Sequence, residues 1–177
     1  MSAGRLSLDE AKRLVDARLG ATPRAEHSRF VGLLMAQLAL ELGDDAGLWR
    51  VVGLVHDLDY FAVDGDWSRH GVLTATWLAG RLPPQALEAI AAHDHRSGVN
   101  SRSGMAQMLK LADAMAVLDQ HGGREPTLAA LRDGATALAA IAGSRPFLVG
   151  IIGGNAAQHG LNLVRLSAML GGLPMQG

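Results

Sequence analysis

Helical periodicity runs through almost the whole of this 177-residue chain, and the alternation of apolar and polar residues that marks a strand is scarce. The ends of the periodic stretches carry helix signals. Ser7 followed by Glu10 resembles a capping box that opens a first helix, and Gly20 ends that helix. Thr22-Pro23 supplies a cap and a first-turn proline for a second helix. The sequence therefore predicts an all-α fold.

The breaks between the periodic stretches predict a bundle of about seven to eight helices. Their expected ranges are 7–20, 22–43, 44–57, 66–82, 83–93, 104–120, 127–142 and 147–170, with an interruption or kink at Gly153-Gly154 in the last. The chain shows no internal repeat, no low-complexity segment and no linker, and its length is typical of one domain. We therefore expect residues 1–177 to form a single domain, with the helices of 124–172 as scaffold or as a homodimer face.

Charge and hydropathy exclude two classes of partner. The formal net charge is -1, so nothing in the charge favours a nucleic acid polymer or an anionic membrane surface. The first 20 residues contain no apolar signal core, and the apolar stretch 147–154 is too short to cross a bilayer. The expectation is a cytoplasmic protein that does not bind a membrane.

Four polar residues lie in stretches that are otherwise apolar, namely His27, the pair His56-Asp57, and Asp113. Imidazoles and carboxylates are costly on apolar helix faces unless they are paired or bound to a metal. The chain has no cysteine, so His, Asp and Glu would have to hold any metal. Such a set is compatible with Mn²⁺, Fe²⁺, Co²⁺, Ni²⁺, Mg²⁺ or Zn²⁺. Helices that aim these groups at one point would build a divalent-metal site.

Each of these residues has a simpler interpretation when it is taken alone, as a hydrogen-bonded core histidine or as a helix-capping Asp. A His-Asp pair is weak evidence, because the chain contains a second one at His93-Asp94. The full set argues for a shared site, since separate buried polar residues would each need a partner of their own.

The order of these residues, a His, a His-Asp pair and a distant Asp on successive helices, resembles the HD-domain superfamily of metal-dependent phosphohydrolases. The similar stretches are EHSRFVGLLMAQLA, LWRVVGLVHDLDY and MLKLADAMAV, and they span roughly residues 24–120. The wording HDLDY is similar to that of a bacterial group of predicted HD hydrolases of undefined substrate. The resemblance implies a helical bundle of the HD-domain type, in which His27, His56, Asp57 and Asp113 bind the metal.

Some members of that superfamily bind two metals, with an extra His after the His-Asp pair and another on the next helix. The resemblance then adds His70 and His93 to the ligands and makes Asp57 the bridging carboxylate. His93 follows the apolar stripe of its helix better than His95, which would support a ligand or contact the substrate. The alternative for His70 is a surface position beside Arg69, so the number of ions, one or two, stays open.

One departure concerns a Lys that many members carry shortly after the His-Asp pair, where this chain has Leu58, Asp59 and Tyr60. Asp57 or Asp59 is the expected general base. Asp59 has two alternative roles, to orient a histidine or to be an ordinary loop carboxylate. The candidates for binding the substrate, each with an ordinary surface position as its alternative, are Arg24, Arg69, His95, Arg96, Arg102 and Lys110.

The resemblance implies hydrolysis of a small phosphorylated molecule, with a nucleotide as the expected class. The metal would lower the pKa of a water molecule and hold a phosphoryl oxygen. Monoester and diester cleavage both remain open. Two other functions stay as alternatives: a non-catalytic module that binds metal or nucleotide, and a di-iron oxygenase, which would require iron and all six ligands.

Overall fold

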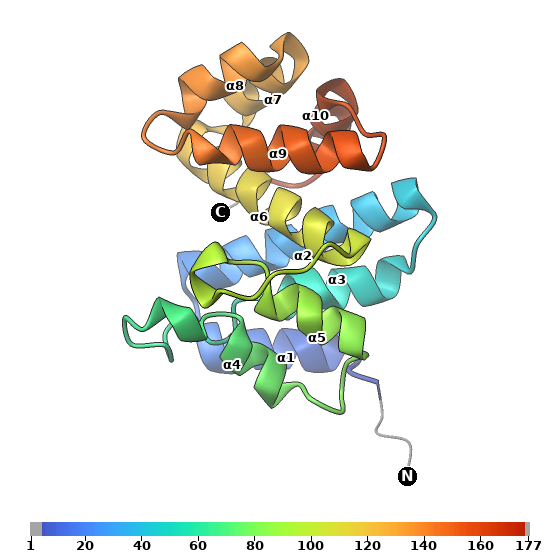
Figure 1. Cartoon of the computed structure of the whole chain (residues 1–177), viewed down its shortest axis with the longest axis vertical. Coiled ribbons are helices and arrows are strands. Elements are labelled where there is room, and N and C mark those ends of the chain that lie inside the picture. Colours follow the sequence, from blue (N-terminus) through green and yellow to red (C-terminus); the bar gives the residue numbers. More distant parts are fainter. Residues whose placement is uncertain (1–4, 176–177) are drawn as a thin grey trace. The chain divides into compact units, whose positions relative to one another are not determined.

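Helices make up all the regular structure of the protein in the computed structural model, which describes residues 5–175 (Figure 1). Within those residues there are ten α-helices, two short 3-10 helices and no strand. The predicted all-α class is therefore confirmed, and the number of helices is higher than the seven or eight expected.

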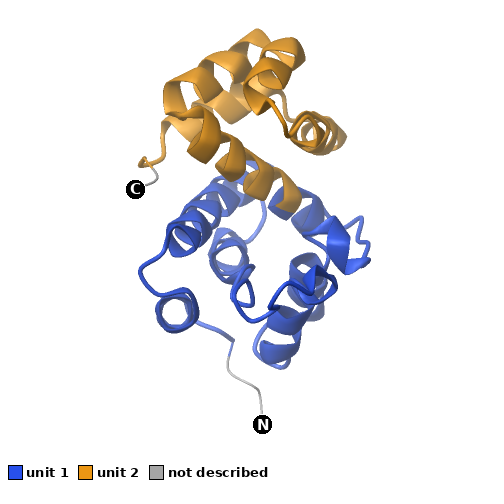
Figure 2. Ribbon diagram, turned by 90° about the vertical axis from the view of Figure 1, so that its left-hand side faces the viewer, with its two compact units in different colours: residues 1–109 blue, residues 110–177 orange. Residues whose placement is uncertain are grey.

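The chain divides into two compact units, residues 1–109 and 110–177 (Figure 2). The boundary falls inside one continuous helix, α6 (Gly104–Gly122), and not in a linker. The single domain stays a prediction. The elements of the first unit before α6 are α1 (Leu8–Leu19), α2 (Pro23–Leu42), α3 (Ala46–Val55), η1 (Trp67–Arg69), α4 (Val72–Trp77), α5 (Pro84–Ala91) and η2 (His95–Ser97).

The predicted helix starts are present in the first unit. The hydroxyl of Ser7 accepts a hydrogen bond from the backbone N–H of Glu10 at 3.2 Å, and the Glu10 carboxylate accepts one from the Ser7 N–H at 2.9 Å, which completes the capping box. Thr22 caps α2 through the N–H of Ala25. Asp45 caps α3 through the N–H of Leu48 at 2.9 Å. Local side-chain chemistry thus fixes where these three helices begin.

Two glycines inside helices let α2 and α3 pack closely. A Cβ atom added at Gly53 would lie 2.8 Å from the carbonyl oxygen of Val31 and 2.9 Å from the Cα of Gly32. At Gly32 it would lie 3.0 Å from the carbonyl oxygen of Arg50. Glycine costs about 1 kcal/mol relative to alanine inside a helix. Here it permits a backbone approach that a larger residue would prevent, and α2 and α3 carry two of the expected ligands to one region.

Four of the expected ligands lie just beyond helix ends and not inside helices as predicted. The third helix stops at Val55, so His56 and Asp57 stand in the turns that follow it. His70 occupies an extended position between η1 and α4. The fifth helix stops at Ala91, two residues before His93. Apolar periodicity continues through these residues because they are buried, although the helical hydrogen bonding has ended.

The second unit contains the remainder of α6, then α7 (Arg124–Asp133), α8 (Ala135–Ala142), α9 (Phe147–Gln158) and α10 (Leu163–Gly171). Both long helices that the sequence predicted there are divided. Gly134, with φ of 103°, separates α7 from α8. The last break falls before Asn162, whose side chain caps α10 through the N–H of Arg165, while Gly153-Gly154 lie inside α9.

A buried arginine ties the end of the chain to the second unit. Arg124 is 6% exposed, and its guanidinium pairs with Asp119 at 2.7 Å. It also donates hydrogen bonds to the carbonyl oxygens of Leu170, Leu173 and Pro174.

Among the described residues, no helix is both long enough and apolar enough to span a membrane.

Candidate metal centre

A cluster of polar side chains lies in the interior of the first unit. Its members come from separate parts of the unit: α2, the turn after α3, the segment after η1 and the turn after α5. None of these side chains belongs to a residue more than 7% exposed. The cluster consists of His27, His56, Asp57, His70 and His93. Burial of so many polar groups together indicates that they serve one another or a common ligand.

The carboxylate of Asp57 stands at the centre of this cluster, and its two oxygens face different histidines. Oδ1 lies 3.2 Å from Nε2 of His70 and 3.4 Å from Nε2 of His93. Oδ2 lies 3.4 Å from Nε2 of His56 and 3.8 Å from Nε2 of His27. Four imidazoles therefore approach one carboxylate as two pairs, one pair on each oxygen.

Hydrogen bonds at Nδ1, the ring nitrogen that does not face Asp57, orient three of the rings. Nδ1 of His56 lies 2.7 Å from the carbonyl oxygen of Gly53, and Nδ1 of His93 lies 2.7 Å from that of Ile90. Nδ1 of His70 lies 2.7 Å from Oδ1 of Asp59. Carbonyl and carboxylate oxygens only accept, so each Nδ1 is the donor. The Nε2 atoms that face Asp57 are thereby the ring nitrogens left to bind a metal.

The charges in the cluster are set by mutual pairing. Burial raises the pKa of the Asp57 carboxyl. Positive charge at His56, the hydrogen bonds from His70 and His93, and the Arg24 guanidinium outweigh that effect and hold the pKa well below its usual range. Burial lowers the pKa of His70, but its bonds to Asp57 and Asp59 outweigh burial and raise the pKa to about 9. Asp57 is therefore ionised at neutral pH.

Asp59 is wholly buried and its carboxylate is fully engaged. Oδ1 accepts from Nδ1 of His70, and Oδ2 accepts from the backbone N–H of Thr74 at 3.0 Å. In return the N–H of Asp59 donates to the hydroxyl of Thr74 at 3.1 Å. Of the roles that the sequence left open for Asp59, this geometry favours the orientation of a histidine.

A glycine separates His70 from α4 and lies against another ring of the cluster. The backbone of Gly71 has φ of 76°. A Cβ atom there would overlap the carbonyl oxygen of Ile90 and would lie 2.9 Å from Nδ1 of His93. The absence of a side chain at Gly71 therefore allows His70 and His93 to approach, and their Nε2 atoms lie 3.2 Å apart.

Two arginines stack on aromatic rings beside the cluster. The Arg24 guanidinium lies 3.9 Å from the ring centre of Tyr60 and donates to Oδ2 of Asp57 at 2.9 Å, while 27% of its side chain remains exposed. The Arg96 guanidinium lies 4.1 Å from the ring centre of Trp67 and pairs with Asp94. Stacking restrains both guanidinium planes.

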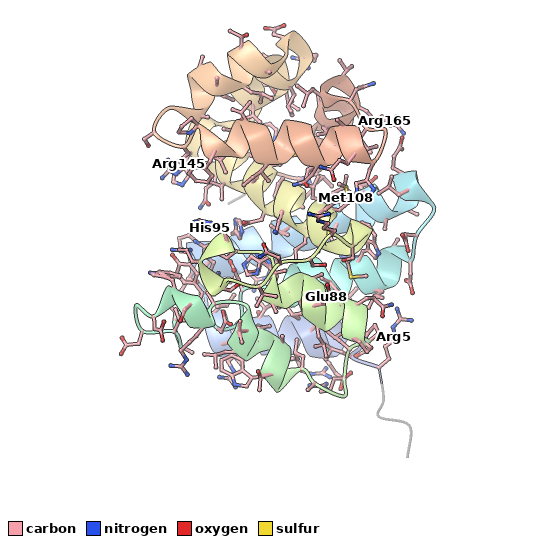
Figure 3. The ribbon with its side chains drawn as sticks, viewed as in Figure 1. Arg5, Glu88, His95, Met108, Arg145 and Arg165 are labelled. Atoms are coloured by element: carbon pink, nitrogen blue, oxygen red, sulfur yellow. The ribbon has the colours of Figure 1, made fainter. Side chains whose placement is uncertain are left out.

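Five other residues that the sequence selected differ in their exposure. The side chain of His95, labelled in Figure 3, is 87% exposed. Arg69 and Arg102 are also exposed, at the surface of the first unit. Lys110 and Asp113 are half-buried on the part of α6 that belongs to the second unit. The role of Asp113 as a ligand stays a prediction.

The donor set fits a divalent metal. His56, Asp57 and His93 each offer a ligand atom, and these atoms lie within 4.8 Å of one another. All three residues are buried, and the chain has no cysteine, so the available donors are imidazole nitrogens and carboxylate oxygens. The buried His and Asp groups of the first unit could therefore hold metal ions.

Sequence reasoning did not find Gly71 or Thr74. The contact between Asp59 and Thr74 joins residues 15 positions apart, in a turn and at a helix start, and no periodic pattern marks it. A signal existed for Gly71, because a glycine directly between a candidate ligand and a helix start indicates a close approach of the backbone.

Comparison with known families gives one match. Residues 24–120 match the HD domain, which is more than half of the chain and includes the entire buried cluster as well as Asp113. Comparison with curated proteins and comparison with solved structures each give no match. The matched residues fold as helices and gather histidines around the Asp of a His-Asp pair. On the extent of this match, the chain belongs to the HD domain family.

Proposed function

We propose that the protein is a metal-dependent phosphohydrolase that acts on a small phosphorylated molecule, with a nucleotide as the expected class. One observation carries the proposal: four buried imidazoles surround both oxygens of one buried, ionised carboxylate in a member of the HD domain family. A core without a metal would have little reason to collect these groups, since each could be replaced by an apolar side chain.

The residues that would hold the metal follow from the two faces of Asp57. His27 and His56 would bind on the side of Oδ2, and His70 and His93 on the side of Oδ1. Asp113 would complete the set, as the family resemblance implies. The division into two pairs supports two ions with Asp57 as the bridge, from among Mn²⁺, Fe²⁺, Co²⁺, Ni²⁺, Mg²⁺ and Zn²⁺.

When bound, the metal supplies a water of lowered pKa and a positive charge for a phosphoryl oxygen. Residues of the chain would bind the phosphate group and accept a proton. Arg24 carries a guanidinium at the border of the cluster with part of its surface exposed, so it can donate to the remaining phosphate oxygens. Arg96 is a second cation of this kind, and Tyr60 and Trp67 restrain the two guanidinium planes. Ionised Asp57 is available as a ligand or as a proton acceptor.

The test begins with metal content. Purified protein is loaded with Mn²⁺ or Co²⁺, its metal is measured by mass spectrometry, and turnover is measured on nucleoside monophosphates, cyclic nucleotides and phosphodiesters. Asp57→Asn should lose metal and should lower turnover by about 100-fold or more, because a metal supplies several kcal/mol of charge stabilisation. His121→Ala, a histidine replacement outside the cluster, should leave both unchanged. Full metal content without turnover on the whole panel would favour the non-catalytic module.

A further inference from the structure

His70 differs from its neighbours in the group that orients its ring. His56 and His93 each donate from Nδ1 to the backbone carbonyl three residues earlier. For His70 the equivalent carbonyl is that of Trp67, and it accepts the backbone N–H of His70 itself at 3.2 Å. The backbone of His70 is extended. The Nδ1 atom of His70 instead faces an acceptor from another part of the chain.

Asp59 supplies that acceptor. Its Oδ1 lies 2.7 Å from Nδ1 of His70, and neither residue is more than 3% exposed. The carboxylate cannot turn freely, because its other oxygen accepts the N–H of Thr74 at the start of α4. Thr74 in turn holds the backbone of Asp59 through its hydroxyl. This reciprocal pair fixes the carboxylate relative to the helix that follows His70.

We propose that Asp59 is a positioning residue that holds His70 with the proton on Nδ1 and with Nε2 directed at Oδ1 of Asp57, so that the metal position on the His70–His93 side depends on Asp59. The inference rests on the proposed metal site. It adds that the metal position on the His70–His93 side depends on Asp59 and that the position on the other side does not. The two carboxylate oxygens of Asp59 are engaged by His70 and Thr74, so its influence is exerted on the His70 side of the cluster.

The chemistry of asparagine makes the inference testable. The amide introduced by Asp59→Asn would keep the size of the carboxylate but would offer one oxygen and one N–H₂ group. The N–H of Thr74 can only donate, so it would take the oxygen and would leave the N–H₂ group facing Nδ1 of His70. Nδ1 would then have to accept, which moves the ring proton to Nε2 and removes the lone pair that binds a metal. Replacing an orienting Asp by Asn acts in this way on other histidines.

The experiment measures Mn²⁺ bound per chain against free Mn²⁺, by equilibrium dialysis, for wild type, Asp59→Asn and Asp64→Asn. Asp64 is an exposed carboxylate of the same loop and serves as the matched control. We expect Asp59→Asn to bind one ion as wild type does and the other about 10- to 100-fold more weakly. Asp64→Asn should follow wild type. A curve for Asp59→Asn that superimposes on that of wild type would overturn the inference and leave the proposed function standing. A wild-type protein that binds no Mn²⁺ would instead overturn the proposed function.

A second measurement needs no variant and covers the case in which Asp59→Asn fails to fold. In wild-type protein loaded with Zn²⁺, nitrogen NMR reports which ring nitrogen of His70 carries the proton. The inference requires the proton on Nδ1. A proton on Nε2 would contradict it.

Discussion

At the scale of single residues, Gly71 and Gly80 form a natural pair for comparison. Both have φ of 76°, a value that L-residues rarely adopt, so alanine is strained at either position. Nothing lies within 4 Å of a Cβ atom at Gly80, whereas at Gly71 the Cβ would strike the Ile90 carbonyl and His93. The two alanine variants therefore differ in whether the added methyl group meets the Ile90 carbonyl and His93.

We expect Gly80→Ala to lower the free energy of unfolding by about 1 kcal/mol. Gly71→Ala should cost about 1–3 kcal/mol more, because the added methyl group overpacks the cluster. It should also weaken metal binding, since the methyl group displaces His93. Urea unfolding and metal titration of both variants test this. Equal losses in the two variants would show that Gly71 does not govern the position of His93.

The sequence predicted much of the site at this scale. His27, His56 and Asp57 were selected from their apolar surroundings and from the family resemblance, which added His70 and His93, and all five are buried. The paired arrangement around Asp57 could not be predicted, because it depends on distances between four separate elements. The orientation of a histidine was only one of the roles that the sequence left open for Asp59. A residue two positions after the His-Asp pair can point either inward or outward when no helix continues through it.

At the scale of elements, capping side chains fix helix starts, and the stabilisation that a carboxylate cap gives depends on pH. Asp45 caps α3, and its pKa is held below the usual value chiefly by the N–H of Leu48 and then by Arg5. A lowered pKa in the folded protein means that Asp45 stabilises the fold above about pH 4 and loses this effect as the pH falls through the folded value.

Asp45→Ala should therefore lower the free energy of unfolding by about 1 kcal/mol at pH 7. The difference from wild type should shrink as the pH falls below the folded pKa, where the carboxyl is protonated. Glu88→Ala, which removes an exposed carboxylate labelled in Figure 3, should have little effect at either pH. Denaturant unfolding at neutral and acidic pH measures this. A pH-independent loss in Asp45→Ala would mean that its charge contributes nothing.

Helix-interior glycines have opposite expected responses to alanine in the two units. Gly53→Ala should destabilise the first unit by about 1–3 kcal/mol, because its methyl group would press against the backbone of α2. Gly154→Ala in α9 should stabilise the second unit by about 0.5–1 kcal/mol, since nothing lies within 4 Å of the added atom and alanine favours a helix. Thermal unfolding of the two variants tests the contrast, and a gain in Gly53→Ala would contradict the close packing of α2 and α3.

The starts of helices were better predicted than their ends. Ser7, Thr22 and Asp45 mark helix starts with side chains whose acceptors act within three residues, so the signal is local. The division at Gly134 and the turn before Asn162 were missed, because the apolar period continues across both. Periodicity reports which side of a segment is buried, and it does not report whether the backbone remains helical.

At the scale of the whole molecule, the two compact units should respond differently to metal. The buried cluster of His27, His56, Asp57, His70 and His93 belongs to residues 1–109. Addition of Mn²⁺ should slow amide hydrogen exchange around 55–60, 70 and 90–93, and residues 124–171 should exchange at an unchanged rate. Hydrogen exchange followed by mass spectrometry checks this, with Asp57→Asn as the variant that should show no response.

Removal of metal should lower thermal stability by a predictable amount. A ligand present at 100 times its dissociation constant stabilises the folded state by about 2.7 kcal/mol, so treatment with a chelator should lower the melting temperature of wild type and restored metal should recover it. Asp57→Asn should melt at the same temperature with and without metal. If neither the chelator nor the restored metal changes the melting temperature of wild type, the folded protein binds no metal.

The position of the histidines just beyond helix ends has a consequence for how such proteins diversify. His56, His70 and His93 each stand where a helix meets a connecting segment, and the contacts that aim them come from backbone carbonyls or from a buried Asp. The outer parts of the same connecting segments are free to change length and chemistry without disturbing helix packing. Evolution can therefore alter what approaches the centre while it preserves the centre itself, so a change of substrate requires new loops and no new scaffold.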